Sequence, residues 1–162
     1  MYPIFHSQSI DFTHAFAQVD ITSGEPLFIE IPRNFKSDGR KFDVFIMLKK
    51  NLYGQAKSVR LWYENLQSGL LYRSFVASKV GLCLFISKNV ICVVYVDDCI
   101  FLEILQYDIG NIIKYFKEDG TSYNWYKSKG KSVSEFLGID INTLDDGGFQ
   151  FCQTGLICKV LE

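Results

Sequence analysis

Residues 91–102, ICVVYVDDCIFL, decide the fold, because every side chain in this stretch is apolar or aromatic except for two adjacent aspartates, Asp97 and Asp98. Consecutive residues of a strand point to opposite faces of a sheet, so one unbroken strand would drive one of these carboxylates into the core. We therefore predict two strands, residues 90–96 and 99–102, joined by a tight turn at residues 96–98. Such a hairpin presents both carboxylates at one end of a buried support.

The segments around this hairpin predict an α+β domain. Residues 82–87 form an apolar run that leads into the hairpin through a turn at Lys88-Asn89. Further strands are expected at residues 7–11, 26–32 and 44–48. Apolar side chains at i, i+3, i+4, i+7 and i+11 predict an amphipathic helix over residues 57–71; these are Val59, Trp62, Tyr63, Leu66 and Leu70. Arg60 and Glu64 form an i,i+4 pair on its other face.

The C-terminal part predicts a second helix and a second hairpin. Ile109, Ile112, Ile113 and Phe116 mark a helix that ends before Gly120. Residues 136–141 and 148–152 are expected to pair across Asp145-Asp146-Gly147, which we interpret as turn chemistry rather than as a metal site. The final residues, TGLICKVLE, look like the first turns of a helix and suggest a fragment.

Composition limits the class of protein. A chain of 162 residues with 48% hydrophobic residues can bury the core of one domain. No apolar run is long enough to span a bilayer and no leader is evident, so we expect an intracellular protein. Five cysteines without a C-x-x-C pair are expected to be buried free thiols. Two basic blocks, residues 33–60 and 114–131, are either solvated surface or a surface that follows phosphates.

The two aspartates leave two interpretations open. An Asp-Asp turn is a common surface feature, but two adjacent carboxylates with apolar flanks raise each other's pKa unless a cation lies between them. Hard divalent ions such as magnesium prefer carboxylates, waters and phosphates. Asp11 is a third carboxylate, either at a strand end or as the N-cap of a helix over residues 12–17.

Five motifs in order resemble the reverse transcriptases of copia-type LTR retrotransposons. Tyr-x-Asp-Asp is present at residues 95–98, and Asp-x-x-x-Ala-aromatic at residues 11–16. LKKNLYGQAKSVRLWYENL at residues 48–66 is similar to the Leu-Lys-Lys-x-Leu-Tyr-Gly block of that family. SKVGLCLF at residues 78–85 and FLGIDI at residues 136–141 also match. Gly81, where the family commonly has Asp, and residues 55–59 depart from the pattern, which puts template positioning in doubt.

The resemblance implies a role for particular residues. Asp11, Asp97 and Asp98 would be catalytic and, with the Phe12 carbonyl, would hold two Mg²⁺ ions, for which Mn²⁺ could substitute. The nucleotide would contact Ala15, Phe16, Tyr53, Gly54 and Tyr95, with Phe16 excluding a 2′-hydroxyl unless it is an ordinary core aromatic. Nucleic acid would contact Lys49, Lys50, Lys57, Arg60 and Gly138, although the cations could equally be solvated ends of elements. A lysine among Lys127, Lys129 and Lys131 could protonate pyrophosphate.

The resemblance also implies an architecture and a context. We expect the palm of a right-hand polymerase: a ferredoxin-like mixed sheet with two main helices on one face and an added C-terminal β-hairpin. Residues 1–162 would be one truncated domain, with fingers before residue 1 and with thumb, connection and RNase H after residue 162. The expected activity is RNA-directed DNA polymerisation in the full-length protein, on an RNA or DNA template-primer with dNTPs, beside the other polyprotein segments.

The expected location is the cytoplasm, in a virus-like particle, or the nucleus, without membrane association. The isolated chain is expected to be inactive, and the alternative function is an inactive retroelement relic. A nucleotide cyclase is disfavoured because the chain has no Gly-Gly-Asp/Glu-Glu-Phe sequence.

Overall fold

The computed structural model describes residues 6–21, 26–31, 45–103, 110–112, 114, 126–127, 134–145 and 148–161. The chain divides into two compact units, Met1–Thr13 with Leu66–Glu162 and His14–Asn65. The assignment of the chain to one domain stays a prediction.

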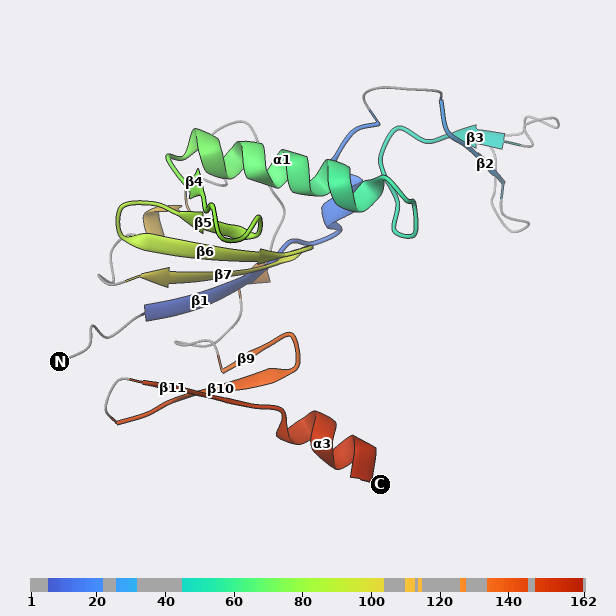
Figure 1. Cartoon of the computed structure of the whole chain (residues 1–162). Helices are drawn as coiled ribbons and strands as arrows, with labels where there is room; N and C mark the ends of the chain where they lie inside the picture. Colours follow the sequence, from blue (N-terminus) through green and yellow to red (C-terminus); the bar gives the residue numbers. More distant parts are fainter. Residues whose placement is uncertain are drawn as a thin grey trace. The chain divides into compact units, whose positions relative to one another are not determined.

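The larger unit is built on a six-stranded sheet with the strand order β4-β5-β6-β7-β1-β8 (Figure 1). Its strands are β1 (His6–Asp11), β4 (Val76–Ala77), β5 (Leu84–Ile86), β6 (Val90–Tyr95), β7 (Asp98–Glu103) and β8 (Tyr126–Lys127). Every pairing among these described strands is antiparallel, so the expectation of a mixed sheet is wrong for this part of the chain. The physical reason is that β4 to β7 follow one another through short connections, which only antiparallel neighbours allow.

The central hairpin predicted from the sequence is confirmed. Strands β6 and β7 pair from Val90↔Glu103 to Tyr95↔Asp98, and β5 joins β6 through a turn in which the Ser87 N–H donates to the Val90 carbonyl at 2.8 Å. The turn between β6 and β7 is tighter than expected: it consists of Val96 and Asp97 alone, and Asp98 already belongs to β7.

The core lies on one face of this sheet. Alternate residues of β6 and β7 are completely or almost completely buried there; they are Val90, Cys92, Val94, Cys99 and Phe101. Leu66 and Leu70, from the C-terminal part of helix α1 (Ser58–Tyr72), are buried as well. Phe75 packs edge-on against Phe101 at a ring-centroid distance of 6.4 Å.

The helix predicted over residues 57–71 is confirmed to within one residue at each end, because α1 extends over Ser58–Tyr72.

The cysteines follow the prediction only in part. All five are free thiols, and Cys92 and Cys99 are buried in the core face. Cys83 and Cys158 are exposed and Cys152 is half-buried, so the expectation of burial is wrong for these three. Cys83 lies in the connection that precedes β5 and Cys158 in a fully exposed helix, and neither environment offers apolar cover.

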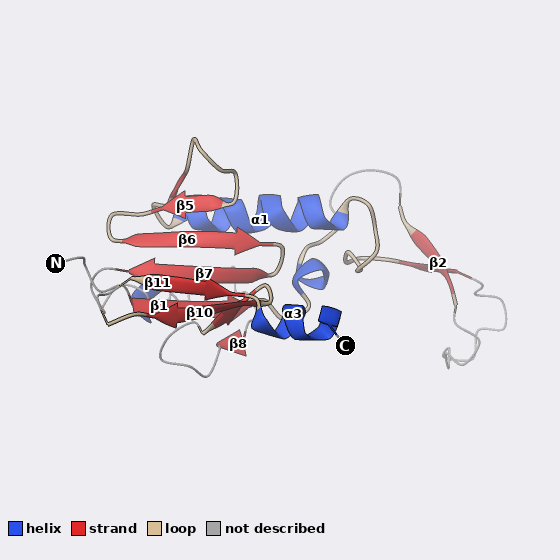
Figure 2. Ribbon diagram, turned by 60° about the horizontal axis from the view of Figure 1, so that its bottom comes forward, coloured by secondary structure: helices blue, strands red, loops and turns tan. Residues whose placement is uncertain are grey.

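A second, three-stranded sheet of the same unit has the order β11-β10-β9, with β9 (Glu135–Phe136), β10 (Ile139–Thr143) and β11 (Phe149–Cys152). In Figure 2 β10 and β11 overlap β7 and β1, and side chains of both sheets line one pocket. An apolar cavity of about 270 Å³ lies between Val93, Ile100 and Leu102 of the first sheet and aromatic and aliphatic side chains of the second. The second sheet is followed by helix α3 (Thr154–Leu161), which confirms the helix expected at the C-terminus.

One strand prediction in this region is wrong. Residues 136–141 were expected to be a single strand, but Leu137 and Gly138 form a two-residue turn between β9 and β10. Their φ angles are 55° and 73°, as a type I′ turn requires at both central positions. The expected pairing of this region with residues 148–152 is confirmed by the register of β10 with β11.

The smaller unit contains the 3-10 helix η1 (Ala15–Gln18) and a two-stranded sheet of β2 (Phe28–Glu30) and β3 (Phe45–Met47). Both strands are shorter than the runs expected at residues 26–32 and 44–48. Helix η1 has His14 as its N-cap, whereas Asp11 is the last residue of β1. The interpretation of Asp11 as a helix N-cap is therefore wrong, because three residues separate it from the helix.

Several expectations fall on residues that the structure does not describe. Residues 110–112 and 114 are helical, in agreement with a second helix, but Ile109, Ile113 and Phe116 lie outside the described residues. So do Asp146, Gly147, Lys129 and Lys131. Packing of two helices on one face thus stays a prediction. None of the helices in the described ranges is both long enough and apolar enough to cross a membrane.

Candidate active site

The site is built on the tip of the β6–β7 hairpin. Tyr95 and Asp98 are directly paired, with Val96 and Asp97 as the two turn residues. Val96 has a φ of 55°, a left-handed conformation that a type II′ turn requires at its first central position and that normally favours glycine. For a β-branched residue this conformation is strained by about 1–3 kcal/mol. The turn therefore keeps the two aspartates in place at the expense of local strain.

Strand β1 brings the third aspartate to the same end of the sheet. In the antiparallel register of β1 with β7, Asp11 lies directly opposite Asp98. The next residue, Phe12, is 1% exposed, and its N–H donates a hydrogen bond of 2.9 Å to the Asp97 carbonyl. The buried ring and this hydrogen bond fix the end of β1 against the hairpin turn. Directly opposite residues of a pair share one face, so Asp11, Asp98 and Tyr95 lie on the same face of the sheet.

The electrostatics of the cluster show mutual repulsion. The pKa of Asp98 is raised above its usual value, first by burial and then by the negative charges of Asp97 and Asp11. All three causes act in the same direction, as expected for like charges gathered at a partly buried site. Oxygen donors of this kind suit Mg²⁺. Within the described ranges, however, no three His, Cys, Asp or Glu side chains are arranged so that they could hold a metal ion together. The role of the aspartates as metal ligands stays a prediction.

The raised pKa of Asp98 predicts how stability depends on pH. Because the folded state binds this proton more tightly than the unfolded state, the free energy of unfolding should fall as the pH rises from the usual Asp range through the raised pKa. Asp98→Asn should flatten this part of the curve and stabilise the metal-free protein at neutral pH. The free energy of unfolding is measured by urea denaturation in EDTA between about pH 3.5 and 7, a range that begins near the usual pKa of Asp.

The control for this prediction is Asp145→Asn, which changes an exposed aspartate that follows β10. It removes one carboxylate outside the Asp11–Asp97–Asp98 cluster and measures the effect of the substitution itself. An unchanged slope in Asp98→Asn would contradict the assignment of the raised pKa to Asp98.

The other nucleotide-binding candidates lie in the smaller unit. Ala15 and Phe16 are buried in η1, and the Phe16 ring packs on Tyr53 with a centroid distance of 4.3 Å and an interplanar angle of 47°. Phe16 is only 4% exposed, whereas Tyr53 is 55% exposed, so solvent reaches this aromatic pair mainly at Tyr53. Gly54 follows in a turn with a φ of 87°, a conformation that explains why glycine occupies this position.

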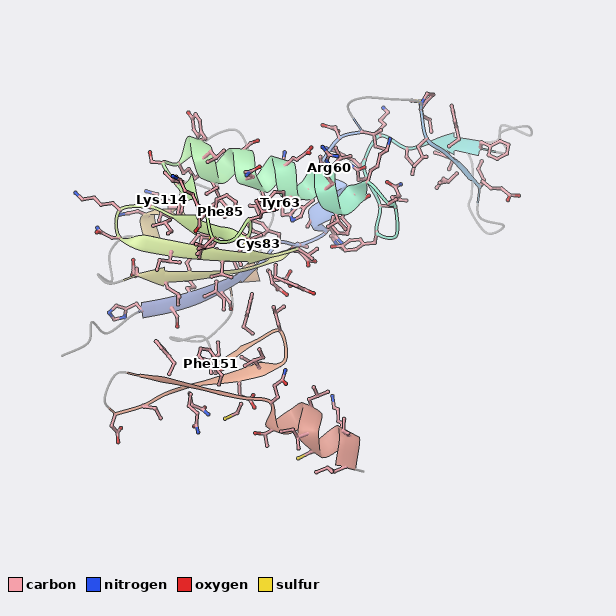
Figure 3. The ribbon with its side chains drawn as sticks, viewed as in Figure 1. Arg60, Tyr63, Cys83, Phe85, Lys114 and Phe151 are labelled. Atoms are coloured by element: carbon pink, nitrogen blue, oxygen red, sulfur yellow. The ribbon has the colours of Figure 1, made fainter. Side chains whose placement is uncertain are left out.

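The basic candidates are all exposed. The Lys50 ammonium lies 2.8 Å from Asp20. Arg60, which is labelled in Figure 3, lies 2.7 Å from Glu64, and this confirms the expected i,i+4 pair. Exposed ion pairs of this kind contribute little to stability, so a phosphate could take the place of Asp20 or Glu64 as the partner of the cation. Lys49 precedes Lys50, and Lys57 precedes α1. Gly138 lies in the β9–β10 turn.

Of the three candidate general acids, Lys127 lies in β8, where its backbone is paired with Ile10, next to Asp11. Lys129 and Lys131 lie outside the described residues. The register thus places one of the three lysines in the strand beside β1, and the choice among them stays open.

Two buried polar residues of the smaller unit were missed from the sequence. Asn51 is 3% exposed and Ser58 is 1% exposed. The Ser58 hydroxyl lies 2.8 Å from the Leu52 carbonyl, to which it donates, and ties the connection before α1 to the start of the helix. The sequence does show polar residues on both sides of Leu-Tyr-Gly, which could have pointed to Asn51 and Ser58. Nothing in a single sequence, however, distinguishes a buried amide from an exposed one.

Fold and site together define an α+β protein with a cluster of carboxylates at one end of an antiparallel sheet. The family model described as reverse transcriptase (RNA-dependent DNA polymerase) matches residues 3–162. Because the match covers almost the whole chain, the chain belongs to the reverse transcriptase family, which implies binding to a nucleic acid template-primer. A comparison with curated proteins found no match.

Proposed function

We propose that the chain is the palm region of a copia-type RNA-directed DNA polymerase, which adds deoxynucleotides to a primer 3′-hydroxyl in a magnesium-dependent reaction. The observation that carries this proposal is the β1–β7 register, in which Asp11 lies opposite Asp98 beside the turn residue Asp97. The Tyr-x-Asp-Asp and Asp-x-x-x-Ala-aromatic motifs supply these residues. Membership of the reverse transcriptase family supports the reaction type.

Asp11, Asp97 and Asp98, with the Phe12 carbonyl, would hold two Mg²⁺ ions, or Mn²⁺ in their place. When bound, such ions lower the pKa of the attacking hydroxyl and neutralise the charge on the triphosphate. The chain itself supplies the negative charge that attracts cations, and it holds the charged carboxylates in position. The Phe12–Asp97 hydrogen bond and the buried Phe12 side chain keep the end of β1 against the hairpin turn, so that the carboxylates need little rearrangement during the reaction.

The nucleotide would be recognised by Ala15, Phe16, Tyr53 and Gly54, with Tyr95 beside Asp98. Phe16 would lie under the sugar and exclude a 2′-hydroxyl. The exposed cations Lys49, Lys50, Lys57 and Arg60 would contact phosphates of the template-primer, and Gly138 would lie near the primer end.

In this proposal fingers, thumb, connection and RNase H segments belong to the same longer polypeptide. The resemblance to retrotransposon enzymes favours a cytoplasmic particle or the nucleus as the place of action.

A non-catalytic retroelement relic is the second candidate. One observation favours it: among the residues that the structure describes, no three acidic, histidine or cysteine side chains are placed to bind a metal together. The two candidates differ in whether the carboxylates bind Mg²⁺ when a template-primer and a nucleotide are present.

Primer extension tests the proposal. The chain, alone and joined to the fingers and thumb of a copia-type reverse transcriptase, is incubated with poly-rA/oligo-dT, dTTP and MgCl₂. The joined protein should extend the primer, EDTA should stop the reaction, and MnCl₂ should partly replace MgCl₂. A folded joined protein that binds the template-primer but adds no nucleotide in either metal would favour the relic.

A further inference from the structure

Asn51 makes two hydrogen bonds to the same acceptor. Its side-chain Nδ2 lies 3.1 Å from the Val19 carbonyl oxygen, and its backbone N–H donates to that oxygen at 3.2 Å. The side chain is 3% exposed, so water cannot replace the bond without rearrangement. A buried amide that loses its partner is costly, and Asn51 is therefore held to Val19 more firmly than a surface residue would be.

These two hydrogen bonds are one step in a continuous path between two aromatic rings. The Val19 N–H donates to the Phe16 carbonyl at 3.2 Å, and the Val19 carbonyl accepts both bonds from Asn51. Tyr53 lies two residues beyond Asn51, and its ring packs on Phe16 at 4.3 Å. The path from Phe16 through Val19 and Asn51 to Tyr53 lies entirely within the smaller unit.

Neighbouring contacts support the same connection from the surface. The Ile21 N–H donates to the Lys49 carbonyl at 3.0 Å, Asp20 and Lys50 form a β-bridge, and their side chains form an ion pair. The two side chains of the ion pair are exposed, so this pair adds little to the connection. Asn51 is the buried member of the group, and its bonds are the ones nearest to the aromatic pair along the chain.

We propose that Asn51 is a positioning residue that sets the separation of Phe16 and Tyr53 and thereby determines how strongly the protein prefers a deoxyribonucleotide to a ribonucleotide. The inference rests on the proposed function, in which Phe16 contacts the sugar. A 2′-hydroxyl adds a single oxygen atom, so a small increase in the freedom of the Phe16 ring is enough to admit it. Loss of the Asn51 amide loosens the segment that carries Phe16, although the Phe16 and Tyr53 side chains themselves are unchanged.

Asn51→Asp and Asn51→Ala test this role. Asn51→Asp keeps the shape but replaces the Nδ2 donor with an oxygen that repels the Val19 carbonyl. Affinities of the full chain for dCTP and CTP, which differ only at the 2′ position, are measured by NMR titration with MgCl₂. The wild type should prefer dCTP, and both variants should lose about tenfold of that preference, chiefly through tighter CTP binding.

A second measurement follows the aromatic pair without any nucleotide. A double-mutant cycle of Phe16→Leu and Tyr53→Leu, measured by urea denaturation, gives the coupling between the rings. This coupling should fall by at least half in the Asn51→Ala background. Leu70→Ala, a core change in the larger unit, serves as the control for general destabilisation: it should lower the denaturation midpoint while the sugar preference and the ring coupling stay as in the wild type.

The outcomes separate the two proposals. A wild type that binds dCTP and CTP equally overturns the role of Asn51 in sugar choice together with the nucleotide role of Phe16. A wild type that prefers dCTP, with Asn51 variants that keep both the preference and the ring coupling, overturns the positioning role alone. Equal loss of preference in Leu70→Ala also overturns it, because the effect would then be one of stability.

Discussion

Asp97→Asn is expected to reduce primer extension by the protein joined to fingers and thumb by about three orders of magnitude or more. Removal of one electrostatic group from a reaction centre commonly costs two to three orders of magnitude in rate, and a carboxylate that holds a metal contributes several kcal/mol. At the hairpin tip Asp97 is one of two turn residues and its carbonyl accepts the Phe12 hydrogen bond. Asn keeps that backbone bond, so the loss should come from charge alone.

The same substitution should leave the fold intact. Replacing Asp97 removes one of the negative charges that raise the pKa of Asp98, so the metal-free protein should be as stable as the wild type or more stable. Extension rates are compared at equal concentrations of protein whose folding has been checked by circular dichroism. Asp145→Asn makes the same chemical change at an exposed aspartate that follows β10 and should retain full activity. Equal activity in Asp97→Asn and the wild type would contradict the assignment of Asp97 as a catalytic residue.

Phe85→Ala is expected to lower the free energy of unfolding by about 3–5 kcal/mol, which is the usual range for a buried phenylalanine. The Phe85 side chain, in β5, is 0% exposed. Small domains have only about 5–15 kcal/mol of stability in total. The variant should therefore denature at a much lower urea concentration, or fail to fold at 37 °C.

Phe151→Ala is the matched control, since it removes the same ring from a side chain in β11 that is 67% exposed. Figure 3 labels both phenylalanines. The control should cost less than about 1 kcal/mol, because most of its surface already meets water. Urea denaturation followed by circular dichroism measures both. Equal losses for the two variants would show that the six-stranded sheet does not hold the main core.

The hairpin was predictable because two rules act on the same few residues. The apolar runs on either side of Asp97 and Asp98 require strands, and two adjacent charges cannot both face solvent within one strand. The structure agrees, with a turn of Val96 and Asp97. The pairing of Asp11 with Asp98 is different: nothing local to residues 6–11 selects β7 as a partner, and the expectation that the three aspartates meet depended on the family motifs.

Other features were hidden from the sequence for physical reasons. The β9–β10 turn interrupts an apolar run, and Leu137 at a φ of 55° has none of the composition that usually marks a turn. The two hydrogen bonds of Asn51 depend on a segment more than 30 positions earlier in the chain. Long-range contacts of this kind decide burial, whereas local patterns predict only the presence and type of an element.

The position of β1 in the sheet has a consequence for the order in which the protein is assembled. Strands β4 to β7 are neighbours in sequence and can pair as soon as they leave the ribosome, but β1 must wait for β7 although it is made first. Closing such a long loop is slow relative to hairpin formation. The pair Asp11 and Asp98 is thus completed late in folding, and detachment of β1 would dismantle the carboxylate cluster while leaving the hairpins intact.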